Sequence, residues 1–283
     1  MYKIKLVDTH FAHAKYSTDI QESKYIVWDR SPITKDDPIG VYTDTSMDRP
    51  YGYHPERPKM KIGWMLESPA ITAPFHQQIK RPEINKDFDL ILTNNREHIE
   101  LNPDKFKFCP TAGCWIYPQD QQIYEKTKLL SAIFSDKKFT SGQSLRHQIV
   151  TNFRNKIDTF GRGYFPLPNK IYGLKDYAFS LVIENTKQDY YFTEKLIDCF
   201  VTGTIPIYWG CPSIGDFFNK DGMICFNDIH DMVYILNDLS IEKYNSMLES
   251  VKENFEKSKD YLMAENYMFE KYLKNYVYLE KQI

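Results

Sequence analysis

The second half of the chain alternates short apolar runs with amphipathic stretches, and this rhythm constrains the fold most strongly. Apolar runs typical of buried strands lie at 129–135, 157–163, 178–185, 204–210 and 222–226. Between them, residues 144–157 and 193–203 have the periodicity of helices, with Ser144 as the expected N-cap of the first and Gly203 as the expected end of the second. Strand, helix and strand repeated in this way predict an α/β fold with a parallel, doubly wound sheet.

The first half contains a similar but weaker pattern. Strands are predicted at 2–7, 24–28, 61–66 and 89–93. Segments rich in Pro, Gly and charge predict long loops around 30–40 and 48–58. Residues 115–127 break the pattern and could join two lobes. We therefore expect an N-terminal lobe over 1–125, a C-terminal lobe over 126–260 and a helical C-terminal segment over 261–283.

Charge and composition exclude several classes of protein. The chain has 36 Lys and Arg against 38 Asp and Glu, so no basic surplus predicts binding to nucleic acid. No apolar run approaches the roughly 20 residues of a membrane-spanning helix, and no signal peptide is recognisable. The expected location is the cytoplasm, with peripheral membrane attachment left open. Five scattered cysteines predict reduced, mostly buried thiols, and the seven histidines show no metal-binding spacing.

An unusually polar segment, Glu184–Lys195, follows one predicted strand and leads into a helix. Ligands of open parallel sheets bind beyond the carboxyl ends of the strands. Arg146 and Lys195 are both predicted near helix starts, where a cation is unfavourable unless an anion binds beside it. Two cations could neutralise a departing diphosphate as a magnesium ion does in other enzymes. Glu194 could accept hydrogen bonds from two neighbouring hydroxyls, as on a ribose.

Each of these residues also has a purely structural interpretation. Arg146 could be an exposed surface arginine, and Glu194 with Lys195 an ordinary surface ion pair. Tyr190 and Tyr191 could be core aromatics rather than ligand contacts. Glu67 ends an apolar strand and precedes Ser-Pro, so it is a candidate general base with a pKa raised by partial burial. It could equally cap backbone amides at the end of its strand.

The segment "DYAFSLVIENTKQDYYFTEKLIDCFVTGTIPIYWGCPSI" at 176–214 resembles the donor-binding signature of the α1,3/4-fucosyltransferases, glycosyltransferase family 10. The resemblance extends to "FGRG" at 160–163, to the Arg-bearing helix "SLRHQIVTNF", and to "WMLESP" at 64–69, which is similar to a family segment carrying a glutamate. One departure is Ala178, at a position that is usually basic in the family. The remainder of the first 125 residues shows no alignable similarity.

The resemblance implies a GT-B fold, in which two Rossmann-like lobes face a cleft and C-terminal helices pack back onto the first lobe. It implies an inverting transfer of fucose from GDP-β-L-fucose to a glycan hydroxyl, with no cofactor and no metal. Glu67 matches the catalytic base, and Arg146 and Lys195 match diphosphate ligands. Glu194 matches the ribose ligand. Asn185 and Tyr191 match further donor contacts, and Glu184 belongs to the motif with a structural or donor role.

Two alternatives stay open at this point. The same fold could use a different nucleotide sugar, or the chain could be a non-catalytic homologue that binds a nucleotide or glycan. The sequence leaves the acceptor, the linkage and the oligomeric state undetermined.

Overall fold

The structure, a computed structural model, describes residues 1–8, 14–48, 57–111 and 113–276. The chain forms two compact units: unit 1 comprises Met1–Gly113 and Met263–Ile283, and unit 2 comprises Cys114–Leu262. Most of the loop predicted at 48–58 lies outside the described residues.

The units divide at 113/114 and 262/263, whereas the sequence pattern placed the divisions after 125 and 260. Hydrogen bonds explain the first difference. The Cys114 amide donates to the Leu262 carbonyl at 2.8 Å, and the Trp115 amide donates to the Asp198 carboxylate at 2.7 Å. The segment after Gly113 is thereby fixed within unit 2.

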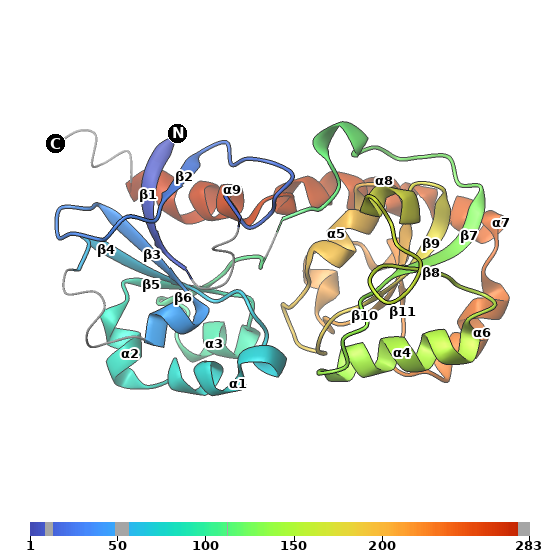
Figure 1. The fold of residues 1–283 in the computed structure, drawn as a ribbon, viewed down its shortest axis with the longest axis horizontal. Helices are drawn as coiled ribbons and strands as arrows, with labels where there is room; N and C mark the ends of the chain where they lie inside the picture. The colour runs from blue at the N-terminus through green and yellow to red at the C-terminus, as the bar shows by residue number, and fades with distance from the viewer. Residues whose placement is uncertain (9–13, 49–56, 112, 277–283) are drawn as a thin grey trace. The chain divides into compact units, whose positions relative to one another are not determined.

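Unit 1 is built on a six-stranded parallel sheet in the order β2-β1-β3-β4-β5-β6 (Figure 1). The strands are β1 (Tyr2–Val7), β2 (Ile26–Asp29), β3 (Ile39–Thr43), β4 (Met60–Trp64), β5 (Leu90–Thr93) and β6 (Phe106–Phe108). The four predicted strands are confirmed with small shifts in their ends. Two strands were not predicted: β3, whose first residues fall in a predicted loop, and the three-residue β6.

Helices cover both faces of this sheet. Figure 1 shows α1 (Pro69–Gln78), α2 (Pro82–Asp87) and α3 (Arg96–Leu101) on one side and α9 (Ala264–Met268) on the other. Met268, Phe269 and Leu273 pack in the same core as Ile4 and Trp64, and this fixes the C-terminal helical segment on unit 1.

Unit 2 is built on a five-stranded parallel sheet in the order β11-β10-β9-β7-β8. The strands are β7 (Lys128–Ile133), β8 (Asp158–Phe160), β9 (Tyr177–Ile183), β10 (Ile205–Trp209) and β11 (Ile224–Cys225). The helices include α4 (Ser141–Phe153), α5 (Glu194–Phe200), α6 (Asp231–Asp238), α7 (Ile241–Ser246) and α8 (Leu248–Ser258). Figure 1 shows α4 and α6 on one side of the sheet and α5 on the other.

The strand order of unit 2 locates its ligand site. The chain runs from β7 through α4 to β8 on one side, and then returns to place β9 on the other side of β7. The connections therefore diverge between the carboxyl ends of β7 and β9, which is the switch point where doubly wound folds bind ligands. The parallel, doubly wound sheet predicted from the sequence is confirmed.

Candidate functional site

Glu184 follows β9 at this switch point and is fully buried. Its carboxylate accepts hydrogen bonds from the Thr193 amide at 2.9 Å and from the Thr193 hydroxyl at 2.8 Å. Burial raises its pKa, and the nearby Lys195 ammonium opposes that rise. A Cβ on Gly210 would lie 2.6 Å from the Glu184 Cγ, so only glycine fits beside it. Glu184 thus closes the loop between β9 and α5, which favours the structural role for this residue.

The predicted position of Arg146 in the first turn of its helix is wrong. Helix α4 begins at Ser141, and Thr140 is its N-cap in a capping box with Gln143. Ser144 is therefore an interior residue and Arg146 lies in the second turn, so the expected conflict with the helix macrodipole does not arise.

Arg146 is 4% exposed and fixes the end of β9. Its Nε donates to the Ile183 carbonyl at 2.9 Å, and its Nη2 donates to the same carbonyl and, at 3.2 Å, to Asn185 Oδ1. The guanidinium lies 5.4 Å from the centre of the Phe134 ring. Arg146 is thus a buried cation at the switch point, and its interpretation as an exposed surface arginine is excluded.

The start of α4 approaches β9 so closely that Gly142 is required. A Cβ there would lie 1.8 Å from the Glu184 carbonyl oxygen. Replacing a helical glycine by alanine normally stabilises a protein by up to about 1 kcal/mol. We expect Gly142→Ala instead to destabilise unit 2 by about 1–3 kcal/mol, because the overlap forces the backbone apart.

Denaturant unfolding measures this effect, and Gly215→Ala is the matched control. A Cβ on Gly215 would meet only the flexible Lys220 side chain, at 3.1 Å. Equal or greater stability for Gly142→Ala would contradict the close approach of α4 to β9.

Lys195 lies in the first turn of α5, as predicted, with Thr193 as the N-cap. Its ammonium is 2.9 Å from the Thr193 hydroxyl, 3.2 Å from Glu194 Oε1 and 3.5 Å from Glu184 Oε2. The Lys195 side chain is 23% exposed and that of Glu194 is 20% exposed, so both reach solvent from a largely buried site. Glu194 and Lys195 are therefore not the ordinary surface ion pair that was the alternative interpretation of these two residues.

Burial opposes the charge of Glu194, but Lys195 and Lys170 outweigh it and lower the pKa of Glu194 to about 2. The carboxylate is therefore ionised at neutral pH and can accept hydrogen bonds from two hydroxyl groups.

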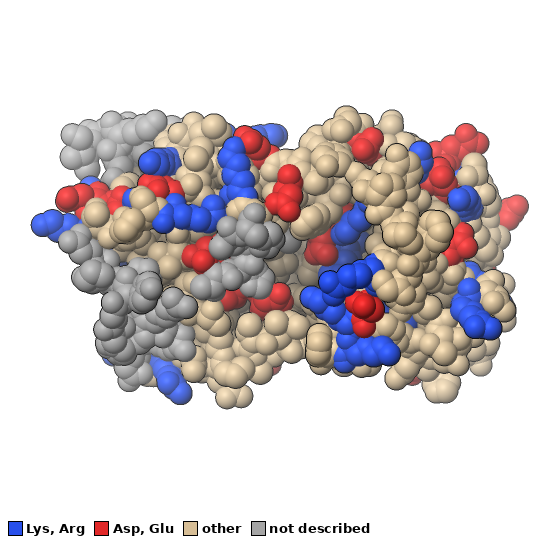
Figure 2. Space-filling view, in the orientation of Figure 1, with Lys and Arg blue, Asp and Glu red and all other residues tan. Residues whose placement is uncertain are grey.

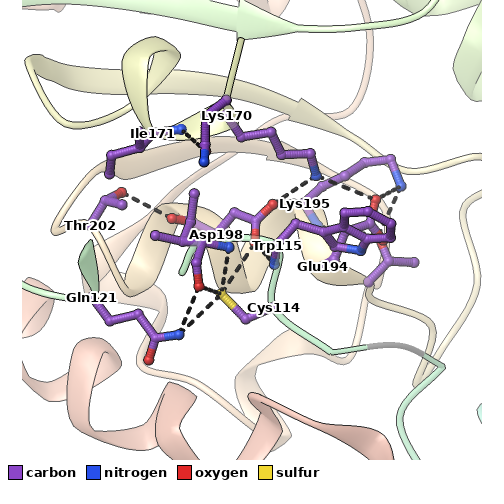
Figure 3. A network of polar contacts seen from close by, with 12 residues as sticks. Cys114, Trp115, Gln121, Lys170, Ile171, Glu194, Lys195, Asp198 and Thr202 are labelled. Atoms are coloured by element: carbon purple, nitrogen blue, oxygen red, sulfur yellow. Dashed lines mark hydrogen bonds and ion pairs between the residues drawn. The ribbon is translucent and has the colours of Figure 1, made fainter. Parts of the chain in front are cut away.

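Lys170 is a third cation near this site, after Arg146 and Lys195, and no sequence pattern predicted it (Figure 3). Its ammonium lies 2.7 Å from Asp198 Oδ2 and 3.9 Å from Glu194 Oε1. Asp198 also accepts the Trp115 amide at 2.7 Å. Asp198 follows Glu194 by one helical turn, so the two carboxylates lie on the same face of α5. This spacing was the sequence signal that could have predicted another cation beside them. Lys170, Lys195 and Asp198 line a small cavity of about 30 Å³.

The loop from Asn185 to Tyr191 carries the remaining predicted donor residues. Asn185 is half-buried and receives the Arg146 hydrogen bond, so it lies at the switch point. Tyr191 is 2% exposed, and its ring lies in the core, as in the structural alternative. Tyr190 has a positive φ of 68°, and its amide donates to Ser213 Oγ at 3.1 Å. These hydrogen bonds hold the loop in a fixed conformation, with Asn185 in contact with Arg146.

In unit 1, Glu67 lies just beyond β4 and is half-buried. Three buried polar side chains bind the backbone around it: Asp44, His76 and Asn94. Asp44, Glu67 and Asn94 follow the neighbouring parallel strands β3, β4 and β5, so they meet at the carboxyl edge of the sheet. Glu67 therefore occupies the edge at which ligands of such sheets bind.

No group of three His, Cys, Asp or Glu side chains that could hold a metal ion occurs within the described ranges. None of the described helices is both long and apolar enough to span a bilayer. Four of the five cysteines are buried and Cys225 is exposed.

Acidic and basic side chains are interspersed over the described part of the face in Figure 2, in keeping with their nearly equal numbers.

Comparison with known proteins places this chain in a family. The C-terminal profile of glycosyltransferase family 10 (fucosyltransferase) matches residues 123–272, which are 150 of the 283 residues. The alpha-(1,3)-fucosyltransferase FucT of Helicobacter pylori is 32% identical over 128 residues, which cover 44% of this chain and 23% of that protein. A putative fucosyltransferase-like protein of Arabidopsis thaliana is 38% identical over 78 residues, 26% of this chain and 15% of that protein. The matched segments thus span less than a quarter of these curated relatives.

Solved structures share the fold at low sequence identity. An alpha1,3-fucosyltransferase solved with GDP-fucose matches with a TM-score of 0.57 and 17% identity, over 92% of this chain and 90% of that one. Anabaena Alr3699/HepE, solved with UDP and glucose, matches with a TM-score of 0.58 and 8% identity, over 84% of this chain and 78% of that one. The two Rossmann-like parallel sheets, with C-terminal helices packed on the first unit, are those of the GT-B fold. With its family profile matched over more than half of its length, the chain belongs to glycosyltransferase family 10, the fucosyltransferase family.

Proposed function

We propose that this chain transfers L-fucose from GDP-β-L-fucose to a glycan hydroxyl, with inversion at the anomeric carbon and without a metal ion. Family membership supports sugar transfer, and a protein of the same fold was solved with GDP-fucose. The observation that carries the proposal is the Lys195 ammonium, which lies between Glu184 and Glu194 at the start of α5. A partly exposed cation at a helix N-terminus, on the carboxyl edge of a parallel sheet, suits a diphosphate.

The proposed donor contacts follow from these positions. Lys195 and Arg146 neutralise the diphosphate, and the Glu194 carboxylate accepts hydrogen bonds from the ribose hydroxyls. Asn185, on the loop between β9 and α5, is proposed as a further donor contact. The Tyr191 ring is buried, so it is proposed to support that loop from the core. Glu184 holds that loop through Thr193.

In the proposed reaction the acceptor oxygen forms a bond to the anomeric carbon as the bond from that carbon to the β-phosphate oxygen breaks. The bonding electrons leave with GDP, whose added charge Lys195 and Arg146 stabilise. The proton of the acceptor hydroxyl passes to the Glu67 carboxylate, which acts as the general base. Unit 1, which carries Glu67, is proposed to bind the acceptor.

A different nucleotide sugar is the second candidate. A protein of the same fold was solved with UDP and glucose, so the fold alone does not select the donor. Ala178, where the family usually has a basic residue, is fully buried in β9. The donor screen described next distinguishes transfer of fucose from transfer of another sugar.

The test is a donor screen read by product mass. The protein is incubated with GDP-fucose, GDP-mannose or UDP-glucose and a panel of β-galactoside acceptors, once in EDTA and once with Mg²⁺ or Mn²⁺. We expect a deoxyhexose to be added from GDP-fucose alone. Transfer of another sugar would support the second candidate, and strict dependence on Mg²⁺ or Mn²⁺ would contradict the proposed role of the two cations. Tight GDP binding without any product would indicate a non-catalytic binding protein.

A further inference from the structure

The backbone of Leu66 and Glu67 is held on its amide side by Asp44. Asp44 Oδ1 accepts the Leu66 amide at 2.9 Å and the Glu67 amide at 3.3 Å. Asp44 is 2% exposed and has a positive φ of 37°. A buried carboxylate and an unfavourable backbone conformation both cost free energy, and such features persist where the surrounding structure imposes them, often at functional sites.

The same peptide region is held on its carbonyl side by His76, from the last turn of α1. His76 Nε2 is 2.8 Å from the Glu67 carbonyl oxygen. A carbonyl only accepts, so Nε2 carries the proton. His76 is 4% exposed, and burial lowers its pKa, which favours the neutral ring. In neutral imidazole the proton on Nε2 leaves Nδ1 as an acceptor, and Nδ1 has no partner among the described residues.

A third element completes the arrangement. The Asn94 amide group, fully buried after β5, donates to the Leu66 carbonyl at 3.0 Å. Side chains from three separate parts of unit 1 therefore fix two consecutive residues. Buried polar groups are costly unless they are satisfied, so their convergence on one short segment indicates that the position of that segment matters.

We propose that Asp44 and His76 are positioning residues for Glu67, which they hold by its backbone amide and carbonyl so that its carboxylate keeps one position. This inference rests on the proposed function, in which Glu67 is the general base. Neither residue touches the reacting atoms. Each acts through Glu67, and misplacement of a reacting group by about 1 Å can cost roughly a hundredfold in rate.

The test compares variants that remove or retain the donor at position 76. His76→Phe keeps a buried ring but cannot donate to the Glu67 carbonyl, and we expect it to lower kcat by roughly ten- to a hundredfold with unchanged affinity for GDP. His76→Gln places an amide N–H near the former Nε2 and should restore part of kcat. His98→Phe is the matched control. His98 is a buried histidine stacked on His76 at 5.4 Å without a hydrogen bond to Glu67, and its replacement should leave kcat near wild type.

A double-mutant cycle separates positioning from general stability. In the Glu67→Gln background, His76→Phe should cause no further loss of the residual turnover, because it acts only through the Glu67 carboxylate. Wild-type kcat for His76→Phe, or the same loss in both backgrounds, would overturn the inference. Full activity of Glu67→Gln itself would instead overturn the proposed base.

Crystal structures give a readout that needs no acceptor. His76→Phe should show the Glu67 peptide rotated or in several conformers, and Asp44→Ala should do the same. One unchanged conformer in both variants would also overturn the inference. Thermal unfolding and GDP binding identify any variant that fails to fold.

Discussion

Glu67→Gln is expected to lose nearly all sugar transfer while it binds GDP as the wild type does. Glutamine matches glutamate in size but cannot take the proton of the acceptor hydroxyl. General base catalysis contributes about 10²- to 10⁴-fold, and we expect a loss of kcat in that range. GDP affinity should persist because the proposed nucleotide contacts all lie in unit 2. Product formation measured with saturating donor, together with calorimetric titration of GDP, checks both parts.

The matched control is Glu100→Gln, which changes a surface carboxylate in unit 1. Glu100 pairs with Arg96 at 2.7 Å and its side chain is 62% exposed. Surface pairs of this kind contribute little, so activity and stability should stay near wild type. Normal turnover by Glu67→Gln would show that another group, or solvent, accepts the proton.

Lys195→Met is expected to weaken GDP binding by roughly ten- to a hundredfold, which corresponds to about 1.4–2.8 kcal/mol. The substitution retains an apolar stem and removes the ammonium between Glu184 and Glu194. The diphosphate would then lie near the ionised Glu194 carboxylate without the Lys195 ammonium to offset its charge. Guanosine lacks phosphate, so its weaker binding should change much less. Titrations of GDP and guanosine against both proteins measure the difference.

Two variants make this result specific. Lys195→Arg keeps the charge and should retain much of the GDP affinity. Lys187→Met removes a lysine of the preceding loop whose ammonium contacts Asn227 Oδ1 at 2.9 Å, and it should bind GDP as the wild type does. An equal loss for GDP and guanosine in Lys195→Met would indicate that the site had collapsed rather than lost a phosphate ligand.

The parallel sheet of unit 2 was predictable because its central strands, β9 and β10, are almost continuous apolar runs. β9 is buried at every position, and β10 is as well. β3 was missed because its start, Ile39–Gly40, adjoins a loop rich in Pro and Asp. Periodicity records which residues face a core, and it detects short strands beside polar loops poorly.

The start of α4 shows how local chemistry can mislead. Ser144 is a good N-cap residue, but Thr140 with Gln143 forms a capping box one turn earlier. The intervening Ser141 and Gly142 are weak helix formers. Gly142 is present because β9 lies against it, which is a tertiary constraint with no local signal.

Spacing alone predicts which site residues lie together where those residues share one segment. Glu184, Glu194 and Lys195 fall within twelve consecutive positions, and their proximity follows from one strand–loop–helix connection. Lys170 meets Asp198 from 28 positions away, and Asp44 meets Leu66 from 22 positions away. Neither contact has a periodicity that a sequence pattern could reveal, because the sheet topology creates both.

The most direct measurement is a crystal structure of the protein with GDP bound. We expect phosphate oxygens at hydrogen-bonding distance, about 3 Å, from Lys195 Nζ and from the Arg146 guanidinium, with the ribose hydroxyls on Glu194. Electron density for the nucleotide elsewhere, or a diphosphate that neither Lys195 nor Arg146 contacts, would contradict the assignment of this site.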